Sequence, residues 1–200
     1  MILPRKVRSN FELNRHTDTT GAADSRGMLN GQSRPALSRL RFGYADVGRA
    51  GCESIAVYNV LRLLDRPRPL ADIIRDMERG GYLRMGGHLG AAPYFEPLLR
   101  RYSAHSRIVT PARLRREERA GTAKPGEAYL MVIWNRRFLP HKGLHTFAAV
   151  RTEDGWEVFN RFNNDETSRL YARLDDIPRN GRSAGAFLVV YRVRRIEDRL

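Results

Sequence analysis

The feature that most constrains the fold is a change in hydrophobic spacing along the chain. Up to about residue 120, apolar residues recur at helical intervals, whereas from residue 128 they form short runs rich in β-branched side chains. The first pattern predicts helices that begin at Cys52, Leu70, residue 91 and, after the cap Thr110, Pro111. The second predicts strands over residues 128–134, 145–151, 156–162 and 186–193. Helices followed by strands indicate an α+β domain, with N-terminal helices packed on a twisted antiparallel β-sheet.

Residues 1–40 differ from the rest of the chain in composition. They contain much Ser, Thr, Asn, Gly and Arg, few large apolar side chains and no clear period. We interpret them as a flexible tail, or as a strap laid on a domain formed by residues 41–200. The apolar residues that would anchor such a strap are Phe11, Leu13, Met28 and Leu29.

Charge and cysteine content exclude several classes of protein. The net charge is +14, from 36 basic and 22 acidic residues, and all but three of the basic residues are arginine. The arginines are spread along the whole chain without interleaved aromatic residues, so nucleic acid is not the favoured partner. One cysteine permits no internal disulfide and no cysteine-rich zinc site. No apolar run approaches the roughly 18–20 residues of a membrane span.

Cys52 is the first candidate for chemistry. It follows Gly51 at the start of the most apolar predicted helix. The partial positive charge at a helix N-terminus favours the thiolate, which is the form that attacks a carbonyl. The alternative is a free cysteine buried in the core, which is common.

A thiolate nucleophile needs a base, and His145 is the best of five histidines. It opens a predicted strand on the same face as Phe147, whereas His105 is expected in a turn. Asn160 lies in the next predicted strand. If the turn is centred between residues 152 and 153, Asn160 faces His145 directly and can orient the imidazole through its side-chain oxygen. A two-residue turn at residues 154–155 would instead place Asn160 opposite Ala149.

Three motifs together resemble the papain-like cysteine peptidase superfamily, in its bacterial C39-like branch. They are Gly-Cys-Glu-Ser-Ile-Ala-Val-Tyr-Asn-Val-Leu at residues 51–61, Leu-His-Thr-Phe-Ala-Ala-Val at 144–150 and Trp-Glu-Val-Phe-Asn at 156–160. The resemblance spans roughly residues 44–162. It implies a papain-like cysteine peptidase domain over residues 41–200. In that domain Cys52 is the nucleophile, His145 the general base and then acid, and Asn160 the orienting group.

Two features depart from the family pattern. The position six residues before the cysteine, where the family has an oxyanion-donating Gln, holds Asp46, and an ionised carboxylate would repel an oxyanion. Three readings remain open. The backbone N–H of Cys52 acts with another donor such as Gln32, Asn59 or a loop amide; Asp46 is protonated or turned away; or the enzyme is weak, altered in its reaction or inactive. Glu53 also adds negative charge that opposes a thiolate. Gly87, His88 and Trp134 are candidates to border a substrate groove.

These observations favour a cysteine-dependent amide hydrolase that acts through a thioester, either a peptidase or a module of a bacterial effector or toxin. A glutamine deamidase or transglutaminase-like transferase uses the same residues. The alternative from another class is a non-enzymatic or inactive papain-like module whose arginines bind nucleic acid or an acidic protein. We expect no metal or cofactor, a peptide or protein substrate, and an acidic protein as a candidate inhibitor. Without a signal-peptide pattern, we expect a cytoplasmic location or export by another route.

Overall fold

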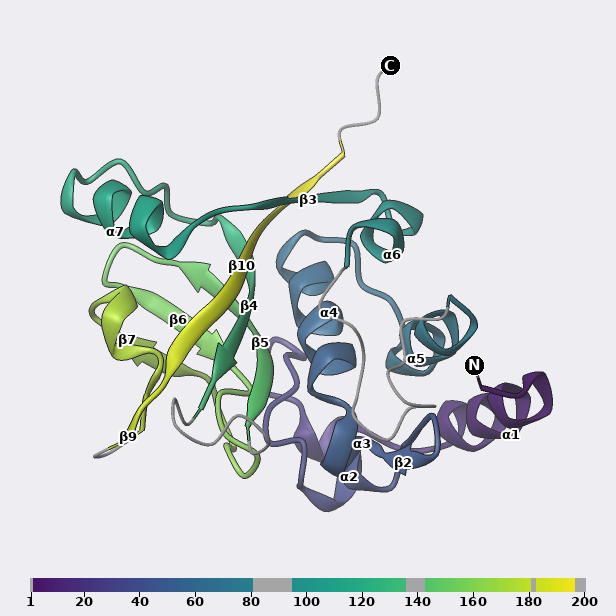
Figure 1. The fold of residues 1–200 in the computed structure, drawn as a ribbon. Helices are drawn as coiled ribbons and strands as arrows, with labels where there is room; N and C mark the ends of the chain where they lie inside the picture. The colour runs from purple at the N-terminus through teal and green to yellow at the C-terminus, as the bar shows by residue number, and fades with distance from the viewer. Residues whose placement is uncertain (1, 81–94, 136–142, 181–182, 197–200) are drawn as a thin grey trace.

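The structure, a computed structural model, describes residues 2–80, 95–135, 143–180 and 183–196 (Figure 1). The described part of the chain forms a mixed α+β fold around a six-stranded antiparallel sheet. In spatial order its strands are β3 (Ala104–Ile108), β10 (Ala186–Arg195), β4 (Ala128–Trp134), β5 (Leu144–Arg151), β6 (Trp156–Phe159) and β7 (Arg169–Tyr171). This architecture agrees with the α+β class predicted from the sequence.

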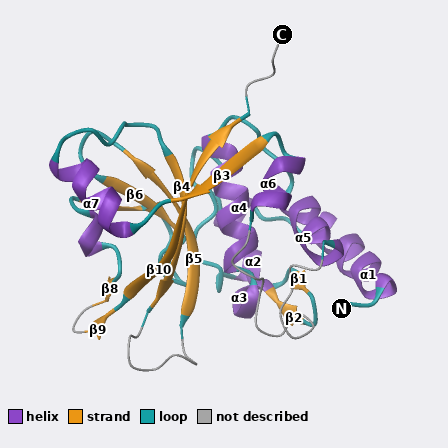
Figure 2. Ribbon diagram, turned by 45° about the horizontal axis from the view of Figure 1, so that its top comes forward, coloured by secondary structure: helices purple, strands orange, loops and turns teal. Residues whose placement is uncertain are grey.

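Both faces of the sheet are covered, because successive side chains of a strand point to opposite sides. On one face, α4 (Cys52–Leu63) packs against β5 and β4, and Ala148 and Val150 share a core with it. Behind α4 lie α5 (Leu70–Arg79), α6 (Glu96–Arg101) and α1 (Pro4–Arg15) (Figure 2). On the other face, Phe147 and Ala149 join a second core closed by α7 (Pro111–Arg119) and the 3-10 turn η3 (Leu174–Asp176).

Most of the predicted elements are confirmed. The helices that begin at Cys52, Leu70 and Pro111 are α4, α5 and α7, and the hydroxyl of Thr110 caps α7 by accepting from the Arg113 N–H at 3.2 Å. Strands β4, β5 and β10 occur where expected, while β6 ends three residues earlier than predicted. The turn expected at His105 is wrong, because this residue lies within β3.

Residues 2–40 are not a free tail in the structure. They form α1, the 3-10 turn η1 (Thr20–Ala22) and α2 (Pro35–Ser38). Between η1 and α2 lies a segment, residues 23–34, that we call the strap. Met28 and Leu29 are buried in the first core, as expected of anchors, whereas Leu13 is exposed.

The remaining short elements are two separate two-stranded sheets and a short helix that precedes α4. They are β1 (Arg41–Phe42), β2 (Ala45–Asp46), α3 (Val47–Ala50), β8 (Arg179–Asn180) and β9 (Ser183–Ala184). A single residue, Gly51, separates α3 from α4.

Candidate functional site

Cys52 is the first residue of α4, and the sharp junction with α3 sets its position. A side chain at Gly51 would not fit this junction, because a Cβ there would lie 2.8 Å from the Cα of Val47. The Ser54 hydroxyl donates to the Gly51 carbonyl at 2.8 Å and closes the first turn. The cysteine therefore stands at a helix N-terminus, as the sequence predicts.

The environment of the sulfur favours the thiol over the thiolate. Cys52 is buried, and its Sγ donates to the Glu53 carboxylate at 3.2 Å. Burial raises the pKa of the Cys52 thiol well above its ordinary value, and the charge of Glu53 adds to this effect. The backbone of Thr146 on β5, the strand against which α4 packs, lowers the pKa and so acts in the opposite direction. The expected activation by the helix terminus is therefore outweighed.

His145 is buried and bonded to Asn160, but not through the predicted atom. Its Nε2 lies 2.6 Å from the backbone carbonyl oxygen of Asn160. Burial lowers the pKa of His145 to about 4; the bond to Asn160 opposes the shift and the nearby charge of Arg161 adds to it. The imidazole is therefore neutral at neutral pH. A carbonyl oxygen only accepts, so Nε2 carries the hydrogen and Nδ1 the lone pair.

The predicted register of the β5–β6 hairpin is wrong. The last pairs are Ala148 with Phe159 and Arg151 with Trp156, which shifts Asn160 by two residues from a position opposite His145. The reason is a four-residue turn closed by a bond from the Thr152 N–H to the Gly155 carbonyl at 2.8 Å. Asn160 lies just beyond the last pair and takes a left-handed conformation with φ of 57°.

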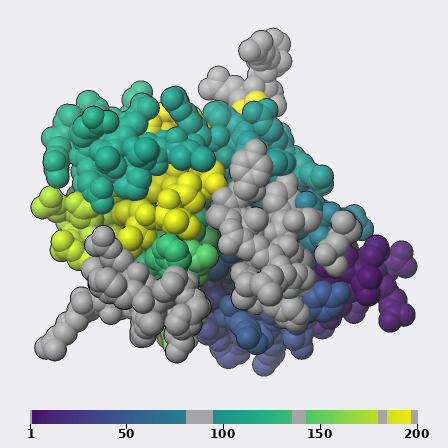
Figure 3. Space-filling model, in the orientation of Figure 1, coloured from purple at the N-terminus to yellow at the C-terminus, as the bar shows by residue number. Residues whose placement is uncertain are grey.

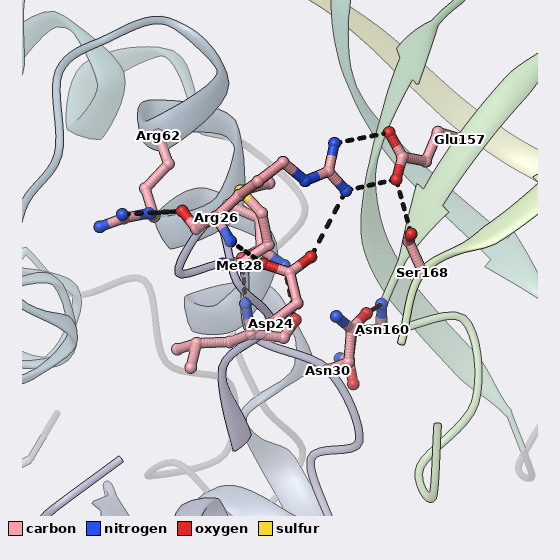
Figure 4. A network of polar contacts seen from close by, with 10 residues as sticks. Asp24, Arg26, Met28, Asn30, Arg62, Glu157, Asn160 and Ser168 are labelled. Atoms are coloured by element: carbon pink, nitrogen blue, oxygen red, sulfur yellow. Dashed lines mark hydrogen bonds and ion pairs between the residues drawn. The ribbon is translucent and has the colours of Figure 1, made fainter. Parts of the chain in front are cut away.

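The side chain of Asn160 bonds the strap instead of the imidazole. Its Oδ1 accepts from the Gln32 backbone N–H at 3.0 Å. The backbone N–H of Asn160 donates to Asn30 Oδ1 at 2.7 Å (Figure 4). The Gln32 amide then donates to the Gly48 carbonyl in α3 at 2.9 Å. The strap thus connects the end of β6 to the helix pair that carries Cys52.

The structure brings the backbone segments of the site together but not the two reactive side chains. Thr146 adjoins the sulfur, while the ring of His145 packs toward Phe147, with centroids 5.9 Å apart. Phe147 belongs to the core on the sheet face opposite α4. Among the hydrogen bonds of the described residues, none joins Cys52 Sγ to the imidazole. Direct proton transfer between them requires the imidazole to turn.

The other predicted site residues have the following places. Asp46 caps α3, because its Oδ1 accepts from the Arg49 N–H at 2.7 Å, and a carboxylate held in this way supplies no donor for an oxyanion. Asn59 is occupied by both backbone groups of Leu29. Trp134 is half-buried at the end of β4, paired with Leu144 next to His145. Gly87 and His88 lie outside the described residues.

Sequence reasoning missed Asn30 and Arg161. The guanidinium of Arg161 is fully buried between Phe147 and Phe162, and it donates to the Ile177 carbonyl at 2.8 Å and to Asn135 Oδ1 at 2.9 Å. It stands directly after Asn160 and acts on the pKa of His145. In a chain with many arginines, the sequence does not indicate which one is buried beside the site.

Comparison with family models, curated proteins and solved structures finds no match to this chain. Within the described ranges, no three acidic, His or Cys side chains gather as a metal site would require. None of the helices described here is both long and apolar enough for a bilayer.

Proposed function

We propose that this chain is a cysteine-dependent amide hydrolase with a papain-like arrangement, in which Cys52 forms a thioester and His145 transfers the proton. The observation that carries the proposal is the meeting of three distant segments at the first turn of α4. Cys52 opens α4, which packs against β5, and Nε2 of His145 on β5 lies 2.6 Å from the Asn160 carbonyl oxygen. A helix-terminal thiol beside a strand that carries a buried neutral imidazole has the components needed for acyl transfer.

The proposed reaction starts from a protonated thiol and a neutral imidazole. Substrate binding breaks the bond from Nε2 to Asn160 and turns the imidazole from the Phe147 side toward the sulfur. Sγ then bonds to the substrate carbonyl carbon, and the thiol proton passes to Nδ1 of His145. The C–N bond then breaks, and Nδ1 returns the proton to the leaving amine. Water attacks the thioester and gives a proton to Nδ1; the acid leaves and Sγ is reprotonated.

The bond to Asn160 sets the tautomer of the imidazole before it turns toward the sulfur. Because the backbone carbonyl of Asn160 holds Nε2–H, the basic nitrogen is Nδ1. The carbonyl is itself held in place, since the strap fixes Asn160 on both sides through Asn30 and Gln32. A base with a pKa of about 4 accepts a proton weakly, so we expect a modest rate on unspecific substrates.

A peptide bond is the first-choice substrate, and a glutamine side-chain amide would form the same thioester. The experiment that tests the proposal does not depend on this choice. The full chain is mixed with p-nitrophenyl acetate, and p-nitrophenolate release is followed together with the mass of the peptide that contains Cys52. We expect acetylation of Cys52 that is lost in Cys52→Ser and slowed at least about hundredfold in His145→Gln. His105→Gln, a histidine on β3, is the matched control.

The pH dependence separates the proposed mechanism from simple thiol chemistry. With His145 as general base, acetylation of Cys52 stays nearly constant above about pH 5, because the imidazole is already neutral. Reaction through free thiolate instead rises about tenfold per pH unit over this range, since the pKa of the thiol is raised. The second profile, or a rate equal to that of the same chain in denaturant, would overturn the proposal.

A second candidate function is a binding module without catalysis. The bond from the Cys52 thiol to Glu53 favours it, because a protonated thiol held by a carboxylate serves packing as well as it serves chemistry. In that case the arginine-rich surface binds the partner, and Cys52→Ala leaves this binding unchanged.

A further inference from the structure

An arginine-lined cavity lies far along the chain from Cys52, where β3 and β10 run side by side and α7 follows β3 (Figure 1). Its volume is about 280 Å³. The described residues that line it come from these three elements and from the link between β3 and α7: His105, Arg107, Val109, Arg113, Arg192 and Arg194. The surfaces of α7 and β10 adjoin on the face shown in Figure 3. We call this cavity the arginine groove.

Like charges face each other across the two strands of the arginine groove. Arg192 on β10 is paired directly with Arg107 on β3, and two positions along Arg194 is opposite His105. The like charges are those of the two paired arginines, Arg192 and Arg107. Directly opposed like charges destabilise a sheet unless something compensates for them. The arrangement therefore requires anions nearby.

Two carboxylates supply part of this compensation. Glu117 binds Arg192 and accepts from Arg113 at 2.8 Å, and Glu127 accepts from Arg194 at 2.8 Å and lies 3.4 Å from Arg192. Arg192 lies between both carboxylates and is largely buried, with 13% of its side chain exposed. Four guanidinium groups against two carboxylates leave two positive charges in the groove.

The uncompensated charge is on the groups that reach solvent. Arg107 is exposed, and its guanidinium makes no hydrogen bond or ion pair with a described residue. The side chains of Arg194 and Arg113 are 56% and 48% exposed, and each has one carboxylate partner. Three guanidinium groups from three elements can thus turn toward one ligand.

We propose that the arginine groove binds the terminal phosphate of a small phosphorylated molecule. A phosphate monoester carries nearly two negative charges and three acceptor oxygens, which match two uncompensated positive charges approached from three directions. A carboxylate offers one charge and two oxygens. The cavity is at the small end of the range for small-molecule sites, and its described lining holds no Phe, Tyr or Trp on which nucleic-acid bases would stack.

The test is calorimetric titration of the full chain with pyrophosphate and with inorganic phosphate, at low and at high salt. We expect pyrophosphate to bind, and the exposed-residue variants Arg107→Gln and Arg194→Gln to weaken it by on the order of tenfold each. The matched controls are Arg5→Gln and Arg8→Gln, each of which removes one positive charge from an exposed position on α1. Binding that survives in the controls and falls in the groove variants supports the proposal.

Three results would overturn it. Citrate that binds as tightly as pyrophosphate would show a general preference for anions. An equal loss of affinity in the α1 controls would show that net charge alone is responsible. An oligonucleotide without a terminal phosphate that competes with pyrophosphate for the groove would identify a nucleic-acid surface instead.

Discussion

The buried carboxyl group of Glu78 gives a prediction whose size follows from the structure. Glu78 lies on α5 and is 2% exposed. Its Oε1 accepts from the Asn10 amide at 2.6 Å and from the Gly43 N–H at 2.7 Å, which ties α1 and the β1–β2 connection to α5. Its Oε2 is buried without a hydrogen-bond partner among the described residues. Lys6 is the one nearby cation that acts on its pKa.

Burial raises the pKa of Glu78 from its ordinary 4.5 to about 7, and the bonds from Asn10 and Gly43 only partly oppose this. An acid whose folded-state pKa is raised stabilises the fold fully below its unfolded-state pKa. That stability is lost as the pH rises through the folded-state value. The window is therefore pH 4.5 to about 7. From about pH 5 to about pH 8 the loss is about 2.5 kcal/mol of the free energy of unfolding.

Glu78→Gln removes this loss, because the amide keeps an acceptor for Asn10 and Gly43 but does not ionise. Urea unfolding followed by tryptophan fluorescence at about pH 5 and about pH 8 measures the difference. We expect the free energy of unfolding of the variant, relative to that of the wild type, to be about 2.5 kcal/mol higher at about pH 8 than at about pH 5. Any cost of the substitution that does not depend on pH cancels in this comparison. Glu12→Gln, an exposed position on α1, controls for the loss of a carboxylate. Parallel pH profiles in wild type and Glu78→Gln would refute the reasoning.

Three further predictions concern the candidate site. Burial lowers the pKa of His145 to about 4, so the neutral imidazole stabilises the fold fully above pH 6.5. The free energy of unfolding should fall by about 3 kcal/mol as the pH falls through about 4. His145→Gln should remove this decrease in urea unfolding measured at acid pH. Asn160→Gly should lower the free energy of unfolding by about 2 kcal/mol, because the bonds to Gln32 are lost. Asn160→Ala should lower it by about 1 kcal/mol more, because alanine disfavours the left-handed backbone conformation of this position. Thermal unfolding of the two variants will check this order. Gly51→Ala should cost about 1–3 kcal/mol by calorimetry, because the added methyl meets Val47; an unchanged melting temperature would show that the α3–α4 junction adapts.

The central elements were predictable because their apolar residues follow the period of the structure they form. Cys52, Ile55 and Val60 are among the buried residues of α4, and the apolar run of β4 is buried along all but its last residue. Helix α1 escaped prediction for the opposite reason. Two of its three buried residues are Asn10 and Asn14, whose amides bond the carbonyls of Gly43 and Arg41. A helix held by amides gives no hydrophobic period.

The candidate site was predictable in its parts but not in its geometry. The sequence indicated Cys52 at a helix start and His145 at a strand start, and both lie there. The hairpin register depended on one turn, whose four residues are compatible with several pairings. The role of Asn30 and Gln32 depends on contacts more than one hundred residues away in the chain, which no local pattern encodes.

The path of the strap has a consequence for how this chain can be shortened. Asn30 and Gln32 satisfy the backbone and side chain of Asn160, and Arg26 pairs with Glu157 on β6. A truncation that begins at residue 41 would therefore strip polar groups of their partners in the interior and open the first core to water. Any minimal version of this domain has to begin upstream of residue 23, however dispensable its N-terminal composition makes it look.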